Sequence, residues 1–192
     1  LLRHQADWLT GWLIGTWRWG EEGNNLRLGW NIETNSWPKS YARAFWEGSL
    51  PKVIPSGKLL AKISKEASQS LDLPKDLFIV SGTTDSNAAV LAAKPLTSDG
   101  ITVLGSTLVL KKFVSHPIHA KGLTNHRING VWLCGGASNC GGATLKRFFD
   151  PEQIDELSKQ INPNIESNLN FLPLQSKGER FPINDPNLEP IL

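Results

Sequence analysis

The sequence predicts an α/β fold, and two features of its 192 residues support that class. Short apolar or β-branched segments, which are typical of strands, alternate with amphipathic or small-residue segments, which are typical of helices. Three turns rich in small residues each follow a predicted strand, and two of these turns precede a predicted helix. Strands, hairpins and helices mixed in this way indicate an α/β domain.

The first predicted element is a helix that carries large aromatic side chains. Trp8, Leu9, Trp12 and Leu13 recur at helical spacing, and Gly15 is expected to end the helix. Seven of the eight tryptophans lie within residues 1–50. Packing of these rings on a core is the favoured interpretation. A carbohydrate-stacking face is an alternative, and a membrane-surface helix is a third, although flanking Lys and Arg residues are lacking.

Turns, a helix and a helix–strand–helix series are expected next along the chain. Asn, Gly and Pro mark turns in residues 23–38. The expected elements are then a helix over Pro38–Glu47, an amphipathic helix over Ile63–Leu71, a short buried strand over Leu77–Val80 and a small-residue helix over Ser86–Ala93.

Hairpins dominate the second half of the prediction. Residues 101–114 are expected to form two strands joined by a tight turn at Gly105-Ser106-Thr107, and residues 126–136 a hairpin with an Asn-Gly turn at 129–130. Two helices and an irregular closing segment are also expected: 141–149, 152–160 and 171–186.

Composition excludes several classes of function. The net charge is +2, and no block of like charges suggests a nucleic-acid partner. No stretch reaches the roughly 18–20 apolar residues of a spanning helix, so no membrane association is expected. Two cysteines encode no disulfide framework and favour a reducing compartment. We expect the cytoplasm, or the plastid stroma if the protein is from a plant. The chain has no methionine and ends in a Pro-rich connector, so we expect an internal piece of a longer protein.

The candidate chemistry lies in the three small-residue turns: GTTDSN (82–87), GST (105–107) and GGASNCGG (135–142). Backbone amides in such turns can bind anions such as phosphate, although none of the three matches a P-loop. Asp85 has two interpretations. As the cap that starts a helix, it is stabilised by the helix dipole, and this is the favoured interpretation from local sequence. As a base, it would accept a proton from an alcohol.

Other constellations fit poorly. The spacings of His116, His119, His126, Cys134 and Cys140 match no zinc pattern. No Gly-x-Ser-x-Gly elbow supports a nucleophilic serine. Cys140 is expected to fill space rather than react.

Five motifs, taken in order, resemble those of the FGGY family of carbohydrate kinases over nearly the whole chain. They are ADWLTGWLIG, GTTDSNAA, VLGSTLVL, GGASNCGGATLKRF and LPLQSKGERFPINDP. Within the family, the residues of these motifs most resemble those of the D-ribulose kinases of cyanobacteria and plant chloroplasts, which are xylulose-kinase-like.

The resemblance implies an actin-like ATPase (ribonuclease H-like) fold of two α/β domains, of which this chain would hold a part. Residues 1–96 would be the end of the sugar-binding domain, and residues 97–192 the start of the nucleotide-binding domain. It also implies ATP and Mg²⁺ as cofactors and a sugar as the second small-molecule partner.

The same resemblance implies roles for single residues. Asp85 would be the general base, and Asp85 and Ser86 would contact the sugar. No residue is assigned to a metal. The nucleotide would be bound by Gly105, Ser106, Thr107, Asn139, Gly142 and Lys146, although many family members carry Gln at the position of this lysine.

Two family motifs are absent, the opening Asp-x-Gly-Thr and the late Gly-rich adenine loop. We therefore expect residues 1–192 to be inactive by themselves. The alternatives are a kinase for xylulose or another sugar or polyol, and a Trp-rich sugar-binding module without catalytic activity.

Overall fold

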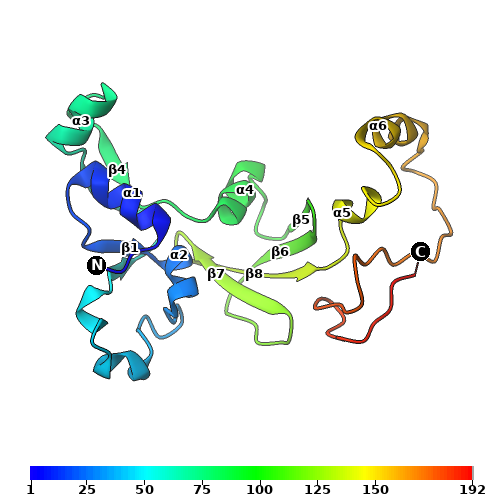
Figure 1. Ribbon diagram of the computed structural model, residues 1–192, viewed down its shortest axis with the longest axis horizontal. Coiled ribbons are helices and arrows are strands. Elements are labelled where there is room, and N and C mark those ends of the chain that lie inside the picture. The colour runs from blue at the N-terminus through cyan, green and yellow to red at the C-terminus, as the bar shows by residue number, and fades with distance from the viewer. Residues whose placement is uncertain (192) are drawn as a thin grey trace. The chain divides into compact units, whose positions relative to one another are not determined.

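The computed structural model describes residues 1–191, and its helices and strands confirm the α/β class (Figure 1). The chain divides into two compact units. The first contains Leu1–Pro95 and His126–Leu133, and the second contains Leu96–Asn125 and the residues from Cys134 onward. Within residues 1–191, no helix is long and apolar enough to cross a membrane.

Helix α1 (Gln5–Ile14) opens the first unit and ends at Gly15, whose φ of 74° suits glycine, as predicted. Its buried residues are Asp7 and Gly11, whereas Trp8 is 53% exposed. Gly11 is required by close packing, since a Cβ there would lie 2.3 Å from the ring of Trp17. The expected packing of the apolar face of this helix on a core is therefore wrong, because polar and small residues form its buried face.

The next segment contains a helix where turns were predicted. Strand β1 (Trp19–Glu21) pairs in parallel with β2 (Lys52–Ile54), and the short helix α2 (Glu22–Asn25) follows β1 directly. The carboxylate of Glu21 caps α2, because it accepts hydrogen bonds from the amides of the second and third helical residues, Gly23 and Asn24. A single turn of 3₁₀ helix, η1 (Leu26–Leu28), comes next.

The predicted helix over Pro38–Glu47 is wrong. Two short 3₁₀ helices, η2 (Lys39–Arg43) and η3 (Glu47–Ser49), occupy this part of the chain, with Ala44 extended between them. The break in the backbone lets Tyr41 and Trp46 meet edge to face with ring centroids 4.7 Å apart. Aromatic packing has overridden local helix propensity here.

Residues 59–93 contain the two helices and the strand that were predicted, together with a strand at 59–62 that was not predicted. Strand β3 (Leu59–Lys62) pairs antiparallel with β4 (Phe78–Val80), and α3 (Lys65–Leu71) lies between them in the chain, capped by Ser64. Helix α4 (Asp85–Ala93) begins one residue earlier than predicted.

One property of β4 differs from the prediction. The strand was expected to be buried, but Phe78 and Val80 are 59% and 52% exposed. Four apolar residues in a row predict a strand covered on both faces. Among the described residues, however, only Ile79 of this strand is partly buried by its neighbours.

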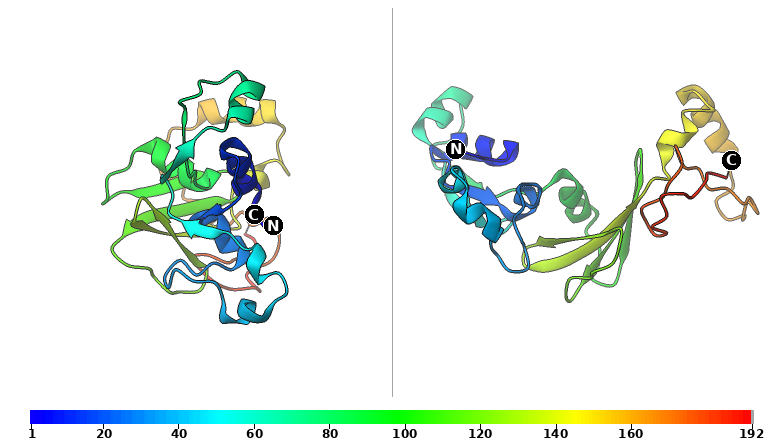
Figure 2. Two further views of the ribbon diagram at one scale, coloured as in Figure 1. Left: turned by 90° about the vertical axis from the view of Figure 1, so that its left-hand side faces the viewer. Right: turned by 60° about the horizontal axis from the view of Figure 1, so that its bottom comes forward.

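A four-stranded sheet of order β5-β6-β8-β7 confirms both predicted hairpins (Figure 2). Strands β5 (Gly100–Leu104) and β6 (Leu108–Val114) pair antiparallel, with residues 105–107 as the connecting turn. Strands β7 (Leu123–Ile128) and β8 (Val131–Ser138) are joined by Asn129 and Gly130, with φ of 48° and 81°. Positive φ at both residues is the signature of a type I′ turn.

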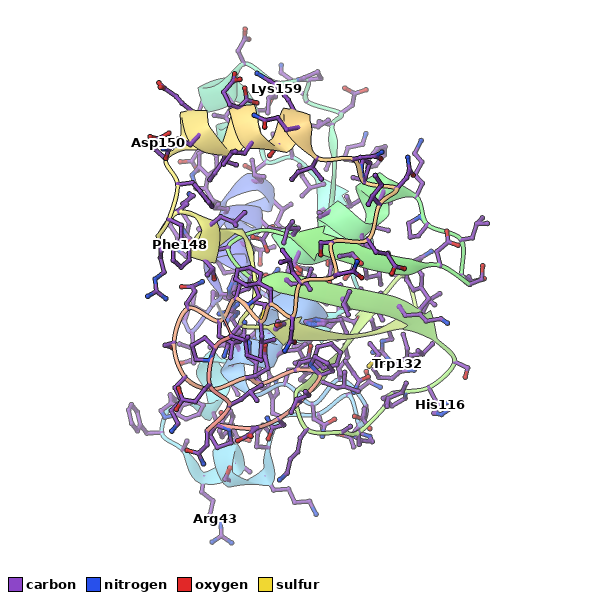
Figure 3. The ribbon with its side chains drawn as sticks, turned by 90° about the vertical axis from the view of Figure 1, so that its right-hand side faces the viewer. Arg43, His116, Trp132, Phe148, Asp150 and Lys159 are labelled. Atoms are coloured by element: carbon purple, nitrogen blue, oxygen red, sulfur yellow. The ribbon has the colours of Figure 1, made fainter. Side chains whose placement is uncertain are left out.

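The C-terminal part of the second unit has two helices. Helix α5 (Gly142–Leu145) is shorter than the predicted 141–149, and α6 (Pro151–Gln160) starts with a capping box of Asp150 and Gln153. Figure 3 shows α6 with Asp150 near one end and Lys159 near the other. The residues after α6 are largely irregular, as expected, and the side chain of Leu174 is fully buried.

Candidate functional site

Asp85 is the first residue of α4, and its carboxylate is exposed. The helix cap is Thr84, whose hydroxyl oxygen accepts a hydrogen bond from Asn87 N at 3.4 Å. The interpretation of Asp85 as the capping residue is therefore wrong. Asp85 Oδ1 accepts a hydrogen bond from Ser86 N at 2.6 Å, and the position at the helix N-terminus favours a negative charge.

The loop before Asp85 is held by backbone and hydroxyl hydrogen bonds. Ser81 is buried, its N donates to Lys58 O at 2.8 Å, and its hydroxyl donates to Pro55 O at 2.7 Å. Lys58 N in turn donates to Ser81 Oγ at 2.8 Å. These bonds fix the end of β4, from which the residues leading to Asp85 extend.

A chain of polar side chains supports the same loop from inside the first unit. The buried Ser56 donates its hydroxyl to Glu21 Oε1 at 2.6 Å and lies 3.5 Å from Thr83 Oγ1. The fully buried Asn87 donates from Nδ2 to Thr83 Oγ1 at 3.4 Å. Thr83 is thus contacted from both sides, and Asp85 follows it by two residues.

A small cavity of about 50 Å³ lies among Asp7, Glu21 and the loop residues 81–83. Asp7 accepts hydrogen bonds from Glu21 N at 2.9 Å and from Asn25 Nδ2 at 2.6 Å. Burial raises the pKa of Asp7, and these two hydrogen bonds oppose the rise. The cavity has room for a water molecule or two.

Sequence reasoning missed this buried polar set. Its signal was the run EEGNN (21–25), five polar or glycine residues directly after a strand, all of which are buried. Such a run resembles an exposed turn in composition, and only contacts with distant residues such as Asp7 and Ser56 distinguish the two cases.

The second unit brings together the two small-residue turns that were predicted to bind phosphate. Gly142 N donates to Gly105 O at 2.8 Å, and Leu108 N donates to Cys140 O at 2.6 Å. A Cβ on Gly141 would lie 2.4 Å from Ser106 O, so only glycine permits this approach. Gly105, Ser106, Thr107 and Gly142 therefore form one cluster, which we call the glycine cluster.

Two backbone amide groups of the glycine cluster have no hydrogen-bond acceptor among the described residues. Among the contacts of residues 1–191, Ser106 N and Thr107 N donate to no protein acceptor. Both residues are at least partly exposed, and Lys146 lies exposed one helical turn after Gly142. Exposed turn amides beside a glycine backbone form a concavity suited to phosphate oxygens.

The first half of the third glycine segment is a strand and not a turn, which corrects the prediction. Gly135 and Gly136 lie within β8. A Cβ on Gly135 would lie 2.6 Å from Leu110 O, and one on Gly136 would lie 2.4 Å from the ring of Phe181. These glycines are therefore explained by close packing of the neighbouring strand and of the Phe181 ring.

Asn139 lies against the residues of the GERFP motif. Its N donates to Glu179 Oε1 at 2.8 Å and its Nδ2 donates to Gly178 O at 2.9 Å. The buried carboxylate of Glu179 also accepts from Ser138 Oγ, Arg180 N and Phe181 N. Burial raises the pKa of Glu179, but the four donors together lower it below its usual value.

The two cysteines carry no disulfide, and burial raises the pKa of both thiols. Among residues 1–191, no three His, Cys, Asp or Glu side chains lie close enough together to hold a metal ion.

No protein-family model matches the chain. Over 163 residues it is 23% identical to YoaC of Bacillus subtilis (strain 168), which bears the name of a sugar kinase, and this match covers 81% of the chain and 34% of YoaC.

Two solved structures show the fold to which the chain is similar. A ligand-bound xylulose kinase from Lactobacillus acidophilus superposes with a TM-score of 0.72 at 19% identity, and a gluconate kinase from the same species with 0.74 at 22%. Each match covers 94% of this chain and 39% of the kinase chain. The chain thus has the fold of part of these kinases, and it spans about a third of the length of YoaC.

Proposed function

We propose that the protein is an ATP-dependent sugar kinase of the FGGY type, in which Asp85 is the general base. The observation that carries the proposal is the exposed Asp85 carboxylate at the start of α4, on a loop fixed by buried polar groups, within a fold matched by sugar kinases. Residues 1–96 would belong to the sugar-binding domain and residues 97–192 to the nucleotide-binding domain.

In the proposed reaction, Asp85 accepts the proton of the attacking sugar hydroxyl. The sugar oxygen forms a bond to the γ-phosphorus, the bond between that phosphorus and the β–γ bridging oxygen breaks, and ADP leaves. A fixed carboxylate is sufficient for this role, because positioning and charge stabilisation provide most of the rate enhancement in phosphoryl transfer. The hydrogen bonds to Ser81 and Thr83 provide that positioning. Ser86, the next residue, would contact the sugar.

The glycine cluster fits a nucleotide phosphate. Ser106 and Thr107 would donate backbone amides and hydroxyls to phosphate oxygens, and Gly142 would leave space for the nucleotide. Lys146 would contribute a positive charge, and Asn139 would line the same site. ATP supplies the phosphoryl group, with Mg²⁺ held chiefly through the phosphates, as is usual for this ion.

D-Ribulose is the proposed substrate, because the sequences of the five motifs resemble those of D-ribulose kinases. D-Xylulose is the second candidate, favoured by the similarity to a xylulose kinase structure. The test is ADP formation by the purified full-length protein that contains residues 1–192, because this part is expected to be inactive by itself, with MgATP and a panel of D-ribulose, D-xylulose, ribitol and gluconate. The highest kcat/KM is expected for D-ribulose. A preference for D-xylulose would support the second candidate, and no sugar-dependent ADP formation with any sugar would contradict the kinase proposal.

A further inference from the structure

A second cavity in the first unit is lined by none of the residues assigned to phosphoryl transfer. It is open and has a volume of about 460 Å³, within the range of small-molecule sites. Its lining combines aromatic, charged and amide side chains with a wall of backbone from the β2 region. The side chains that matter to the argument are those of Glu22, Trp30, Asn35, Trp37, Lys52 and Arg127.

The two tryptophans are placed by a tight turn. Asn31 and Ser36 form an antiparallel bridge, and Asn31 Oδ1 accepts hydrogen bonds from Glu33 N and Thr34 N. The bridge brings its two flanking residues, Trp30 and Trp37, together, with ring centroids 5.1 Å apart at an interplanar angle of 70°. Two rings at nearly a right angle form an apolar corner of the cavity wall.

One donor in this corner is unused by the protein. Trp30 Nε1 is buried, and among residues 1–191 it has no hydrogen-bond partner. An indole N–H can only donate, and buried donors are paired in nearly all native structures. A ligand oxygen in the cavity would satisfy this group.

An ion pair forms the polar side of the cavity. Arg127 Nη2 donates to Glu22 Oε2 at 2.6 Å and to Asn35 Oδ1 at 2.7 Å, and Arg127 Nε donates to Glu22 Oε2 at 3.2 Å. The Glu22 side chain is only 2% exposed and that of Arg127 18%. The guanidinium also lies over Trp132, 5.3 Å from the ring centroid. Paired in this way, the two charges offer fixed hydrogen-bonding groups without a net charge.

These features define the ligand chemistry. Apolar indole faces suit the C–H faces of a sugar ring or chain, and an N–H, a carboxylate and an amide suit its hydroxyls. Lys52 is the one lining charge without a counter-ion among the described residues, and it is exposed, with its amine 5.4 Å from the centroid of the Trp19 ring. Because the charge of Lys52 is exposed to solvent, whereas the charges of Glu22 and Arg127 compensate each other inside the cavity, a neutral polyhydroxylated ligand is favoured over an anion.

We propose that the cavity formed by Trp30, Trp37, Glu22, Asn35 and Arg127 is a binding site for a neutral sugar or polyol, separate from Asp85 and the glycine cluster. Proton transfer at Asp85 plays no part in it. Binding at this site therefore requires neither ATP nor the Asp85 carboxylate.

Isothermal titration calorimetry of the purified protein without ATP tests the proposal, with D-ribulose, D-xylulose and ribitol as probes. Trp30→Phe removes the indole donor, and Asn35→Gly removes the amide while keeping a residue that tolerates the φ of 48°. Each is expected to raise the Kd of the best probe at least tenfold. Trp8→Phe, whose side chain is exposed and outside the cavity, is the matched control and is expected to leave Kd unchanged.

Asp85→Asn separates this site from the proposed active site. Sugar binding that survives Asp85→Asn but is weakened by both cavity variants supports the proposal. Binding that is lost in Asp85→Asn and unchanged in Trp30→Phe and Asn35→Gly would overturn it while leaving the kinase function intact. Absence of binding by all three probes would also overturn it, as would tight binding of D-ribulose 5-phosphate alone, which would indicate an anion site.

Discussion

The buried carboxylate of Glu179 accepts a hydrogen bond from the hydroxyl of Ser138 at 2.5 Å, although the two residues are 41 positions apart. Ser138 is the last residue of β8, and Glu179 belongs to the GERFP motif. The contact therefore joins the end of β8 to the C-terminal segment, three residues before Gly141, which packs against the turn at 105–107. We infer that Glu179 stabilises the geometry of the glycine cluster from outside it.

Glu179→Ala should destabilise the second unit by at least about 2 kcal/mol, because it removes a buried acceptor and leaves several donors unpaired. Chemical denaturation of the purified protein measures this loss. Glu189→Ala is the matched control, since Glu189 is exposed and forms an ion pair with the exposed Lys177. Its effect should stay within about 0.5 kcal/mol. Equal effects of the two substitutions would show that the buried network does not stabilise the fold.

The contribution of Glu179 should also depend on pH. Its pKa is lower in the folded state than in the unfolded chain, so its stabilisation is present above the unfolded pKa and is lost as the pH falls through the folded pKa. The difference in unfolding free energy between wild type and Glu179→Gln should therefore shrink in acid. A difference that is constant with pH would contradict this assignment.

Asp7 should show the opposite dependence. Burial raises its pKa, so its ionisation favours the unfolded chain, and its stabilising contribution is present below the unfolded pKa and is lost as the pH rises through the folded pKa. Relative to Asp7→Asn, the wild type should become less stable as the pH rises through this range. Unfolding curves measured at a series of pH values test this sign, and a wild type that gains stability over that range would contradict it.

Gly141→Ala should raise the KM for ATP at least tenfold and cost about 1–3 kcal/mol of stability, since the new Cβ would lie 2.4 Å from Ser106 O and displace the turn. Steady-state kinetics with ATP as the varied substrate and thermal unfolding measure both effects. Gly100→Ala is the control, because a Cβ there meets no atom within 4 Å. An unchanged KM for ATP in Gly141→Ala would remove the glycine cluster from the nucleotide site.

Local turn chemistry made much of the fold predictable. The Asn129-Gly130 pair and the turn at 105–107 specify their hairpins through a few adjacent residues, and Gly15 ends its helix through its own backbone conformation. Asp85 and the residues of the glycine cluster could be proposed as site residues for the same reason, as each lies in a short motif next to a predicted strand.

The parts that depend on distant contacts could not be predicted. Glu21 is a buried cap bonded to Ser56 at a separation of 35 residues, and nothing in its neighbouring sequence distinguishes it from an exposed turn residue. The segment Pro38–Glu47 has a composition compatible with a helix, but the packing of Tyr41 on Trp46 favours a broken backbone. The Glu22–Arg127 pair joins residues 105 positions apart.

The central claim is that Asp85 is the base of a sugar kinase, and the kcat of Asp85→Asn in sugar-dependent ADP formation by the full-length protein tests it most directly. We predict a fall of at least about 100-fold, the usual contribution of a general base, with unchanged thermal stability and with Asp99→Asn, an exposed carboxylate elsewhere on the surface, retaining wild-type kcat. If kcat of Asp85→Asn stayed within tenfold of wild type, a difference of about 1.4 kcal/mol in activation free energy, the assignment of Asp85 as the base would be wrong.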